Sequence, residues 1–238
     1  MEKKIYLFLY RLTLVAIVYF VVKLVSPFTF DKIFPIEAID ITGNYDHVER
    51  EQVFMVVEKY LEGNFFSLNI KKFKNGFEKL PWVEKAEINR SWPGKISVKV
   101  VEHIPIARYG KRGIGLVNQD GIYFHAASNQ NLPFFEGPKE KLQEIAYKYN
   151  SFSKILRDNI MQIKRLSLLR QTEWSIETTD GLIINIGEHN PEEKLTSFMR
   201  NYQKVLFHMK KRITYVDLRY RDGFSVSVDE QIKKINNL

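Results

Sequence analysis

The chain has 238 residues, a hydrophobic fraction of 45% and a formal net charge of +8 at pH 7. This length is enough for two modest domains and an additional segment. Cysteine is absent, which excludes thiol catalysis, disulfides and cysteine-based zinc sites. The positive charge suits nucleic acid or an anionic membrane surface. Because the sequence has no dense Lys/Arg block and no nucleic-acid motif, we expect no nucleic-acid partner.

Residues 5–25 form an apolar run of about the length that spans a bilayer. Arg11 and Lys23 interrupt it, and long side chains of this kind reach toward the membrane surface. The alternatives are a cleaved signal peptide and a buried core helix. A retained anchor is favoured because the run lacks a good cleavage site and is apolar on every face. Lys3 and Lys4 then place the short N-terminus in the cytoplasm and the remaining chain outside.

A connector leads into a segment that predicts a strand, two helices and two further strands. Asp46, with Glu49 three residues later, predicts a capping box at the start of the first helix. Asn69 to Lys79 predicts the second helix. The first helix has an expected core stripe of Val53, Phe54, Val57, Tyr60 and Leu61.

The most regular part of this segment is a β-hairpin that ends at Glu102. Apolar and polar residues alternate on both of its strands with a period of two. Trp92-Pro93-Gly94 turns the chain between the strands. A hairpin with one apolar face needs a cover, which the two helices supply. The segment is therefore expected to be a compact α+β module.

From residue 104 onward short strand signals dominate, and two helices interrupt them. The helices are expected from Lys139 to Leu156 and from Pro191, which follows the capping residue Asn190. The strands are expected at residues 106–109, 115–117, 122–124, 132–135, 160–169, 174–178, 182–187, 213–220 and 224–228. We therefore expect an α+β protein whose last domain is a mixed β domain, with two helices packed on an antiparallel sheet.

The expected organisation has six parts. In chain order they are a cytoplasmic N-terminus (1–4), a transmembrane helix (5–25), a linker (26–35), the α+β module (36–103), the β domain (104–229) and a flexible tail (230–238).

This order of segments resembles the FtsQ/DivIB family of bacterial cell division proteins, in which the α+β module is a POTRA domain (β-α-α-β-β). The resemblance covers nearly the whole chain, and its specificity comes from the order and spacing of short motifs. These motifs are Leu80-Pro81-Trp82-Val83, Arg90 with Trp92-Pro93, Val101-Glu102, Ile104-Pro105-Ile106-Ala107-Arg108, Leu116-Val117 to Gly121, Phe124, Leu132-Pro133, Gly137-Pro138, Trp174 to Gly187, and Tyr215-Val216-Asp217-Leu218-Arg219-Tyr220.

The resemblance implies a non-enzymatic divisome scaffold that needs no cofactor or metal. It would be a single-pass type II protein of the bacterial inner membrane, in contact with its lipid, at the division septum. In the family the β domain binds FtsB and FtsL, or the DivIC equivalent, and the POTRA domain contributes to recruitment and to contact with FtsK. Such a scaffold links early and late divisome components and recruits or regulates septal peptidoglycan synthesis.

The family's partner-binding positions fall near the end of this chain. The matching residues are Arg219, Tyr220 and Gly223. The register of the strand then assigns the next positions to Phe224, Ser225, Val226, Ser227 and Val228. The sequence departs from the family at two of them, since relatives carry Trp in place of Val228 and small residues in place of Phe224. A further family arginine precedes the strand at Trp174, and Arg170 is the nearest candidate.

The residues themselves also indicate a binding edge. No strand signal follows Val228, so this strand is a candidate sheet edge whose free N–H and C=O groups accept another strand. Tyr220 is an aromatic residue of the kind that anchors interfaces, and Arg219 suits an acidic partner residue. The alternative is that Tyr220 packs inside the domain and the strand is merely the last one in its sheet.

The POTRA motif residues allow a binding role or a structural role, and we expect the structural one first. Trp82 is expected to pack at the corner between helix and strand, and Arg90 to be exposed and paired with Glu102 across the hairpin. The complete set is Pro81, Trp82, Arg90, Trp92 and Pro93.

An enzyme, an outer-membrane assembly or secretion factor and a generic membrane-tethered adaptor are the rival classes. The five histidines form no metal-spaced pair, and no P-loop, dinucleotide or Gly-x-Ser-x-Gly motif occurs. Glu188-His189 falls in a turn and is more typical of a solvated surface. Outer-membrane factors carry several POTRA copies or a long barrel of alternating strands, which this chain lacks.

Overall fold

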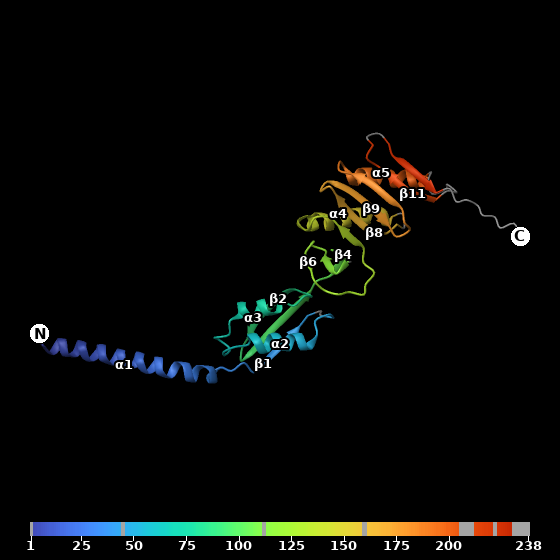
Figure 1. Ribbon diagram of the computed structural model, residues 1–238. Helices are drawn as coiled ribbons and strands as arrows, with labels where there is room; N and C mark the ends of the chain where they lie inside the picture. The colour runs from blue at the N-terminus through green and yellow to red at the C-terminus, as the bar shows by residue number, and fades with distance from the viewer. Residues whose placement is uncertain are drawn as a thin grey trace, which may run out of the picture. The chain divides into compact units, whose positions relative to one another are not determined.

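The computed structural model describes residues 2–43, 46–110, 113–158, 161–204, 212–220 and 223–229 (Figure 1). The chain divides into two compact units between His103 and Ile104. Helix α1 (Glu2–Ile33) belongs to the first unit. Within the described residues, Ile5–Lys23 is the one helical stretch long and apolar enough to cross a membrane. None of it is buried against protein, which is consistent with a single-pass membrane protein.

The rest of the first unit has the predicted order of elements. It consists of β1 (Ala38–Thr42), α2 (Arg50–Tyr60), α3 (Ile70–Phe77), β2 (Val83–Ser91) and β3 (Lys95–Glu102). The sheet order is β1-β3-β2, with β1 parallel and β2 antiparallel to β3. The predicted hairpin is β2–β3, closed by the pair Ser91–Lys95 around the turn.

Helices α2 and α3 supply the cover that the hairpin needs (Figure 1). Phe73 and Phe77 of α3 are completely buried, as is Val98 in the centre of the sheet. The two helices approach closely at Gly76, where an added Cβ would lie 2.5 Å from the Tyr60 ring. A glycine at this position therefore permits the helix contact.

Two details of α2 differ from the sequence prediction. The N-cap is Glu49, whose amide donates to Gln52 Oε1 at 3.3 Å, and not Asp46. Phe54 is 67% exposed and does not belong to the core stripe. Val56 is the buried residue of α2, and Phe54 points elsewhere because successive residues are rotated by about 100° around a helix.

The second unit contains one nine-stranded sheet and two long helices. Its elements are β4 (Pro105–Tyr109), β5 (Gly115–Asn118), β6 (Tyr123–Phe124), β7 (Phe134–Glu136), η2 (Lys139–Lys141), α4 (Leu142–Arg157), β8 (Ile163–Leu169), β9 (Glu173–Thr178), β10 (Ile183–Gly187), α5 (Pro191–Lys204), β11 (Arg212–Asp217) and β12 (Ser225–Asp229). The strand order is β12-β11-β10-β9-β8-β7-β4-β5-β6.

The expected α+β fold is confirmed, but the sheet is mixed rather than antiparallel. Three neighbouring pairs are parallel, namely β4–β7, β7–β8 and β10–β11. Two of them follow from the helices. α4 connects β7 to β8 and α5 connects β10 to β11, and a helical crossover of this kind returns the chain in the same direction.

Both helices contribute to the core of this unit. Phe152 of α4 meets Trp174 of β9 edge-to-face, with ring centroids 5.9 Å apart. The spacing of apolar residues in the sequence predicts a core stripe along α5, and Leu195, Phe198 and Met199 of that stripe are buried. Tyr202 of the same stripe is partly buried against the core. Val205, Leu206 and Met209 lie outside the described residues, as does the predicted tail.

Candidate functional site

Strand β12 forms one edge of the nine-stranded sheet, and among the described strands its only neighbour is β11. Ser225 pairs with Asp217, and Val226 pairs with Val216. The outward N–H and C=O groups of β12 therefore have no strand partner within the described part of the chain. Backbone groups of this kind form a template for an added strand.

The side chains of β12 alternate between the core and solvent. Val226 and Val228 are partly buried against the core, while Ser225 and Ser227 are exposed. Phe224, just before the strand, packs edge-to-face on Phe198 of α5, with ring centroids 5.4 Å apart. The edge strand is thereby attached to the domain on one face, which leaves its outer edge in a defined position.

Tyr220 lies in the segment between β11 and β12 and is 58% exposed. It borders a hollow of about 500 Å³ between α5 and this segment. The hollow is lined by Glu193, Lys194, Ser197, Phe198, Asn201, Leu218, Tyr220, Gly223 and Phe224. Aromatic and charged groups thus meet beside the edge strand.

Arg219 forms a two-pronged ion pair with Asp217 inside the same domain. Its Nε lies 3.0 Å from Oδ1 and its Nη2 lies 2.8 Å from Oδ2. Hydrogen bonding from Arg219 holds the pKa of the Asp217 carboxyl below its ordinary value. The Arg219 side chain nevertheless stays 49% exposed, and Nη1 is not used by Asp217. Within the described residues Nη1 has no acceptor, which makes it the donor available to an acidic partner group.

A second hollow, of about 460 Å³, brings Arg219 together with residues from two other elements. It is lined by Glu173, Gly187, Glu188, His189, Asn190, Lys194 and Arg219. Arg170 joins its border through Glu173, since its Nη1 lies 3.5 Å from Glu173 Oε1. The Arg170 side chain is 80% exposed. Arg219 and the Glu173 partner of Arg170 thus line the same hollow, next to the ends of β9 and β10.

The POTRA motif residues occupy different environments. Trp82 is only 8% exposed and stacks on the His47 ring, with centroids 3.8 Å apart. Pro81 and Pro93 are exposed. Trp92, in the hairpin turn, is 69% exposed.

The expected ion pair between Arg90 and Glu102 is wrong. Arg90 Nη2 donates to the carbonyls of Phe66 and Leu68, at 3.2 and 2.7 Å. The reason is position along the hairpin, because Arg90 pairs with Ile96 near the turn whereas Glu102 pairs with Val83 at the other end.

Glu102 has a structural role that sequence analysis does not find. Its carboxylate accepts the amides of Asp46, His47 and Val48, at 3.2, 2.9 and 2.7 Å. The side chain is 9% exposed. The contact joins the end of β3 to the loop before α2. No local pattern signals it, because more than 50 residues separate the partners.

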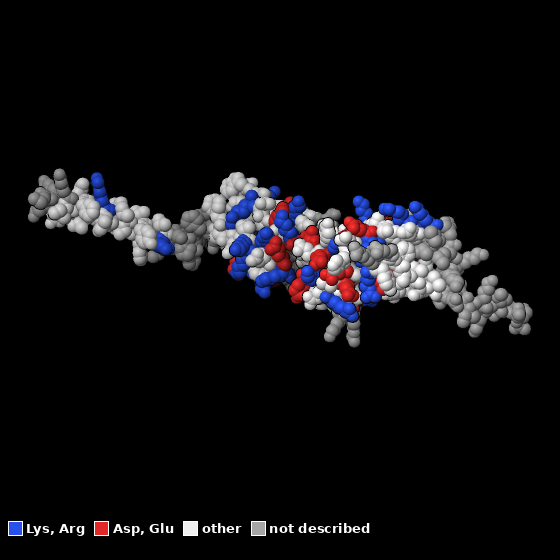
Figure 2. All heavy atoms as spheres, turned by 90° about the horizontal axis from the view of Figure 1, so that it is seen from above, with Lys and Arg blue, Asp and Glu red and all other residues white. Residues whose placement is uncertain are grey.

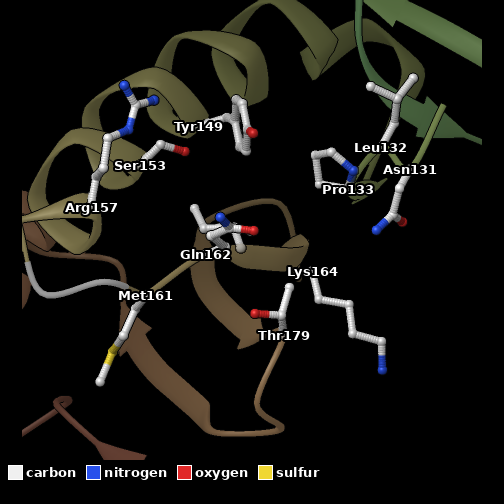
Figure 3. Close-up of a pocket in the computed structure, with 11 residues that line it drawn as sticks. Asn131, Leu132, Pro133, Tyr149, Ser153, Arg157, Met161, Gln162, Lys164 and Thr179 are labelled. Carbon is white, nitrogen blue, oxygen red and sulfur yellow. The ribbon is translucent and has the colours of Figure 1, made fainter.

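A third hollow lies away from the sheet edge, between α4 and the start of β8 (Figure 3). Tyr149, Ser153 and Arg157 face it from α4, and Lys164 faces it from β8. Its volume is about 400 Å³. The Lys164 ammonium group is held by Glu177 at 2.5 Å, and hydrogen bonding from Lys164 lowers the pKa of that carboxyl. The hollow is separated from β12 by β9, β10 and β11.

Charge and metal-ligating residues are dispersed. Figure 2 shows Asp and Glu side chains interspersed with Lys and Arg, so the face in view carries no single basic block. Within the described ranges no group of three or more His, Cys, Asp or Glu side chains is placed to hold a metal ion. Glu188 and His189 are both exposed.

Comparison with known proteins gives the family. A model of the FtsQ-type POTRA domain matches residues 34–103, and a model of the FtsQ/DivIB C-terminal region of cell division proteins matches residues 107–219. The chain is 34% identical to cell division protein FtsQ of Nitrosospira multiformis over 184 residues, which are 77% of each chain. It belongs to the FtsQ/DivIB family. The resemblance seen in the sequence motifs is thereby confirmed.

Two further FtsQ relatives show how far the family similarity extends. The chain is 27% identical to cell division protein FtsQ of Neisseria gonorrhoeae, covering 81% of this chain and 79% of the relative. It is 28% identical to cell division protein FtsQ of Coxiella burnetii, covering 82% of this chain and 81% of the relative. The family model of the C-terminal region ends at Arg219, so Tyr220 and β12 lie beyond the matched range.

Proposed function

We propose that this chain is a membrane-anchored scaffold of the division apparatus that binds FtsB-like and FtsL-like (DivIC-like) proteins through β12. The N-terminus lies in the cytoplasm, α1 crosses the inner membrane, and both folded units work on the outer side, at the septum. The protein acts by holding partners rather than by catalysis. It links early and late division proteins, including FtsK through the POTRA domain, and so recruits or regulates septal peptidoglycan synthesis.

One observation carries the proposal, namely that β12 is a sheet edge flanked by an exposed tyrosine. A partner strand laid along β12 gains main-chain hydrogen bonds without any rearrangement of the sheet. Ser225 and Ser227 present small polar side chains, which do not obstruct a neighbouring strand. The edge is short, which limits pairing with wrong partners.

Side chains next to the edge supply specificity. Tyr220 offers a large apolar ring with a polar tip, a residue type enriched in the energetically dominant part of interfaces. Arg219 offers Nη1 to an acidic residue of the partner while Asp217 holds the rest of the guanidinium. The hollow beside Phe198 and Phe224 accepts an apolar partner side chain.

The test is capture of FtsB-like and FtsL-like proteins from detergent-solubilised cells by full-length chain. Tyr220→Ala is expected to lower capture at least tenfold, because truncation of such an anchor typically costs about 2 kcal/mol or more. Tyr147→Ala is the matched control, since Tyr147 lies on α4 of the same unit and is 68% exposed. Unchanged capture by Tyr220→Ala would contradict the proposal.

Phe224 is a poor choice for this test. Its ring packs on Phe198, so Phe224→Ala weakens the domain as well as the edge.

Capture of outer-membrane assembly or secretion components instead of division proteins would favour the rival role of a POTRA-containing assembly factor. Both matched family models are of the FtsQ type, which argues against that rival.

A further inference from the structure

Four aromatic residues gather at one corner of the POTRA domain, and we call them the aromatic tip. Phe34 meets Phe66 edge-to-face with centroids 5.0 Å apart, and its ring lies 6.3 Å from Trp92. Phe65 meets both Phe66 and Trp92, at 5.1 and 6.1 Å. The residues come from three separate parts of the chain, so the tip is a product of the fold.

Backbone hydrogen bonds fix the tip at the point where the chain enters the POTRA domain. The amide of Phe65 donates to the carbonyl of Phe34 at 3.0 Å. The amide of Glu37 donates to the carbonyl of Gly94, in the same turn as Trp92, at 2.8 Å. Arg90 also holds the loop, because its Nη2 donates to the carbonyl of Phe66. The tip is therefore a rigid surface rather than a set of loose side chains.

The outer part of the tip is left uncovered by the protein. Trp92 is 69% exposed and Phe66 is 58% exposed, while Phe65 beneath them is 5% exposed. The two other tryptophans, Trp82 and Trp174, are 8% and 3% exposed. Two large exposed aromatic rings that both pack on Phe34 and Phe65 are unfavourable in water, so the tip is expected to have an occupant.

The distance to the apolar segment identifies that occupant. Ten residues lie between Lys23, the last residue of the apolar stretch, and Phe34. If helical they rise about 16 Å, and α1 extends to Ile33. The tip is the first part of the POTRA domain after the membrane helix. A tilt of that helix by about 40° lowers Phe34 to about 12 Å above the hydrocarbon core. The headgroup layer extends about 5–7 Å from that core, so the exposed rings of Phe66 and Trp92 have to cover the remaining distance. Tryptophan is the residue type most typical of this layer.

We propose that the aromatic tip is a second membrane contact, in which Trp92 and Phe66 insert into the outer lipid interface beside α1. This inference rests on the proposed membrane anchoring by α1. The contact would hold the POTRA domain close to the bilayer and restrict how it swings about the linker. Trp92, a member of the predicted POTRA motif, thereby acquires a role in lipid contact.

The composition of the chain permits a direct test. The protein has three tryptophans, and none lies in residues 5–23. The full-length chain is reconstituted into phosphatidylethanolamine–phosphatidylglycerol vesicles whose acyl chains are brominated near the headgroup, and tryptophan fluorescence is compared with unbrominated vesicles. Bromine quenches tryptophan fluorescence by contact. Quenching is therefore expected only for the part of the emission that comes from Trp92, since Trp82 and Trp174 are buried. Trp92→Phe should abolish the quenching, and Phe66→Ser should reduce it.

Flotation of the same vesicles separates the two proposals. A chain that does not float with lipid would contradict membrane anchoring itself. A chain that floats but shows no quenching would overturn the aromatic tip as a lipid contact. Quenching that persists in Trp92→Phe would come from another tryptophan and would also overturn it. A protein-binding role would overturn it as well. In that case the lipid would not quench Trp92, and an added division protein would shield Trp92 from aqueous iodide.

Discussion

Arg219 combines an intramolecular ion pair with a second donor, Nη1, that Asp217 does not engage. Asp217 holds Nε and Nη2, which fixes the direction of the side chain before any partner arrives. A guanidinium that is already oriented loses less rotamer entropy when Nη1 binds a further carboxylate. At the residue scale, the site is therefore partly preorganised for an acidic partner residue.

His103 is expected to make the stability of the POTRA domain sensitive to mild acid. Burial lowers the pKa of its imidazole below the ordinary value of 6.5 and outweighs the Glu84 carboxylate, whose Oε2 lies 3.9 Å from Nδ1. The unfolded chain therefore binds a proton at this residue more readily than the folded chain does. The contribution of His103 to the free energy of unfolding should be fully present above about pH 6.5. The free energy of unfolding should then decrease as the pH falls below that value.

His103→Gln is expected to remove this slope, as measured by urea unfolding of the full-length chain in detergent between about pH 7 and pH 5.5. Titration of the carboxylates with shifted pKa values does not contribute to the slope in this pH range. The pKa values of Asp217, Glu177 and Glu87 are lowered, so their contribution is lost only in more acidic solution. An identical slope in wild type and His103→Gln would contradict the assignment.

At the scale of elements, Glu102 ties the end of β3 to the start of α2. Glu102→Ala leaves three amides without their acceptor. It should lower the free energy of unfolding of the POTRA domain by about 1–3 kcal/mol. Urea unfolding of the full-length chain measures the change. Glu87→Ala is the control, because Glu87 pairs with Lys85 on the surface and should have little effect. Equal effects of the two substitutions would contradict the role of Glu102.

Local patterns predict the individual elements well, as the β2–β3 hairpin shows. Its alternation places Ala86 opposite Val100 and Ile88 opposite Val98, and the turn falls at Trp92–Gly94. The alternation and the turn both lie within 20 residues of sequence. The same holds for α5, which begins at the predicted Pro191 and has acidic residues in its first turn.

Contacts between distant segments escape this kind of prediction. The parallel β10–β11 pair depends on where α5 returns the chain, and the Glu102 contact spans more than 50 residues. For the candidate site, Ser225 to Val228 are predictable as a strand. The exposure of Tyr220 and the pairing of Arg219 with Asp217 depend on packing that only the structure provides.

At the scale of the whole molecule, the proposed topology places both folded units on one side of the membrane. The absence of cysteine allows single cysteines to report on this directly. In intact spheroplasts a membrane-impermeant maleimide should label Asn150→Cys, at an exposed position on α4, and should label Lys3→Cys only after permeabilisation. The reverse labelling pattern would contradict the orientation.

The most direct test of the central claim is amide hydrogen exchange at β12, measured on the full-length chain in detergent with and without an FtsB-like partner. In a two-sided strand about half of the amides face each neighbour, so the outward amides of residues 225–229 should exchange more slowly in the complex. Exchange in α2 and α3 should stay unchanged. A stable complex that leaves exchange at 225–229 unaltered would show that the partner does not pair with this strand.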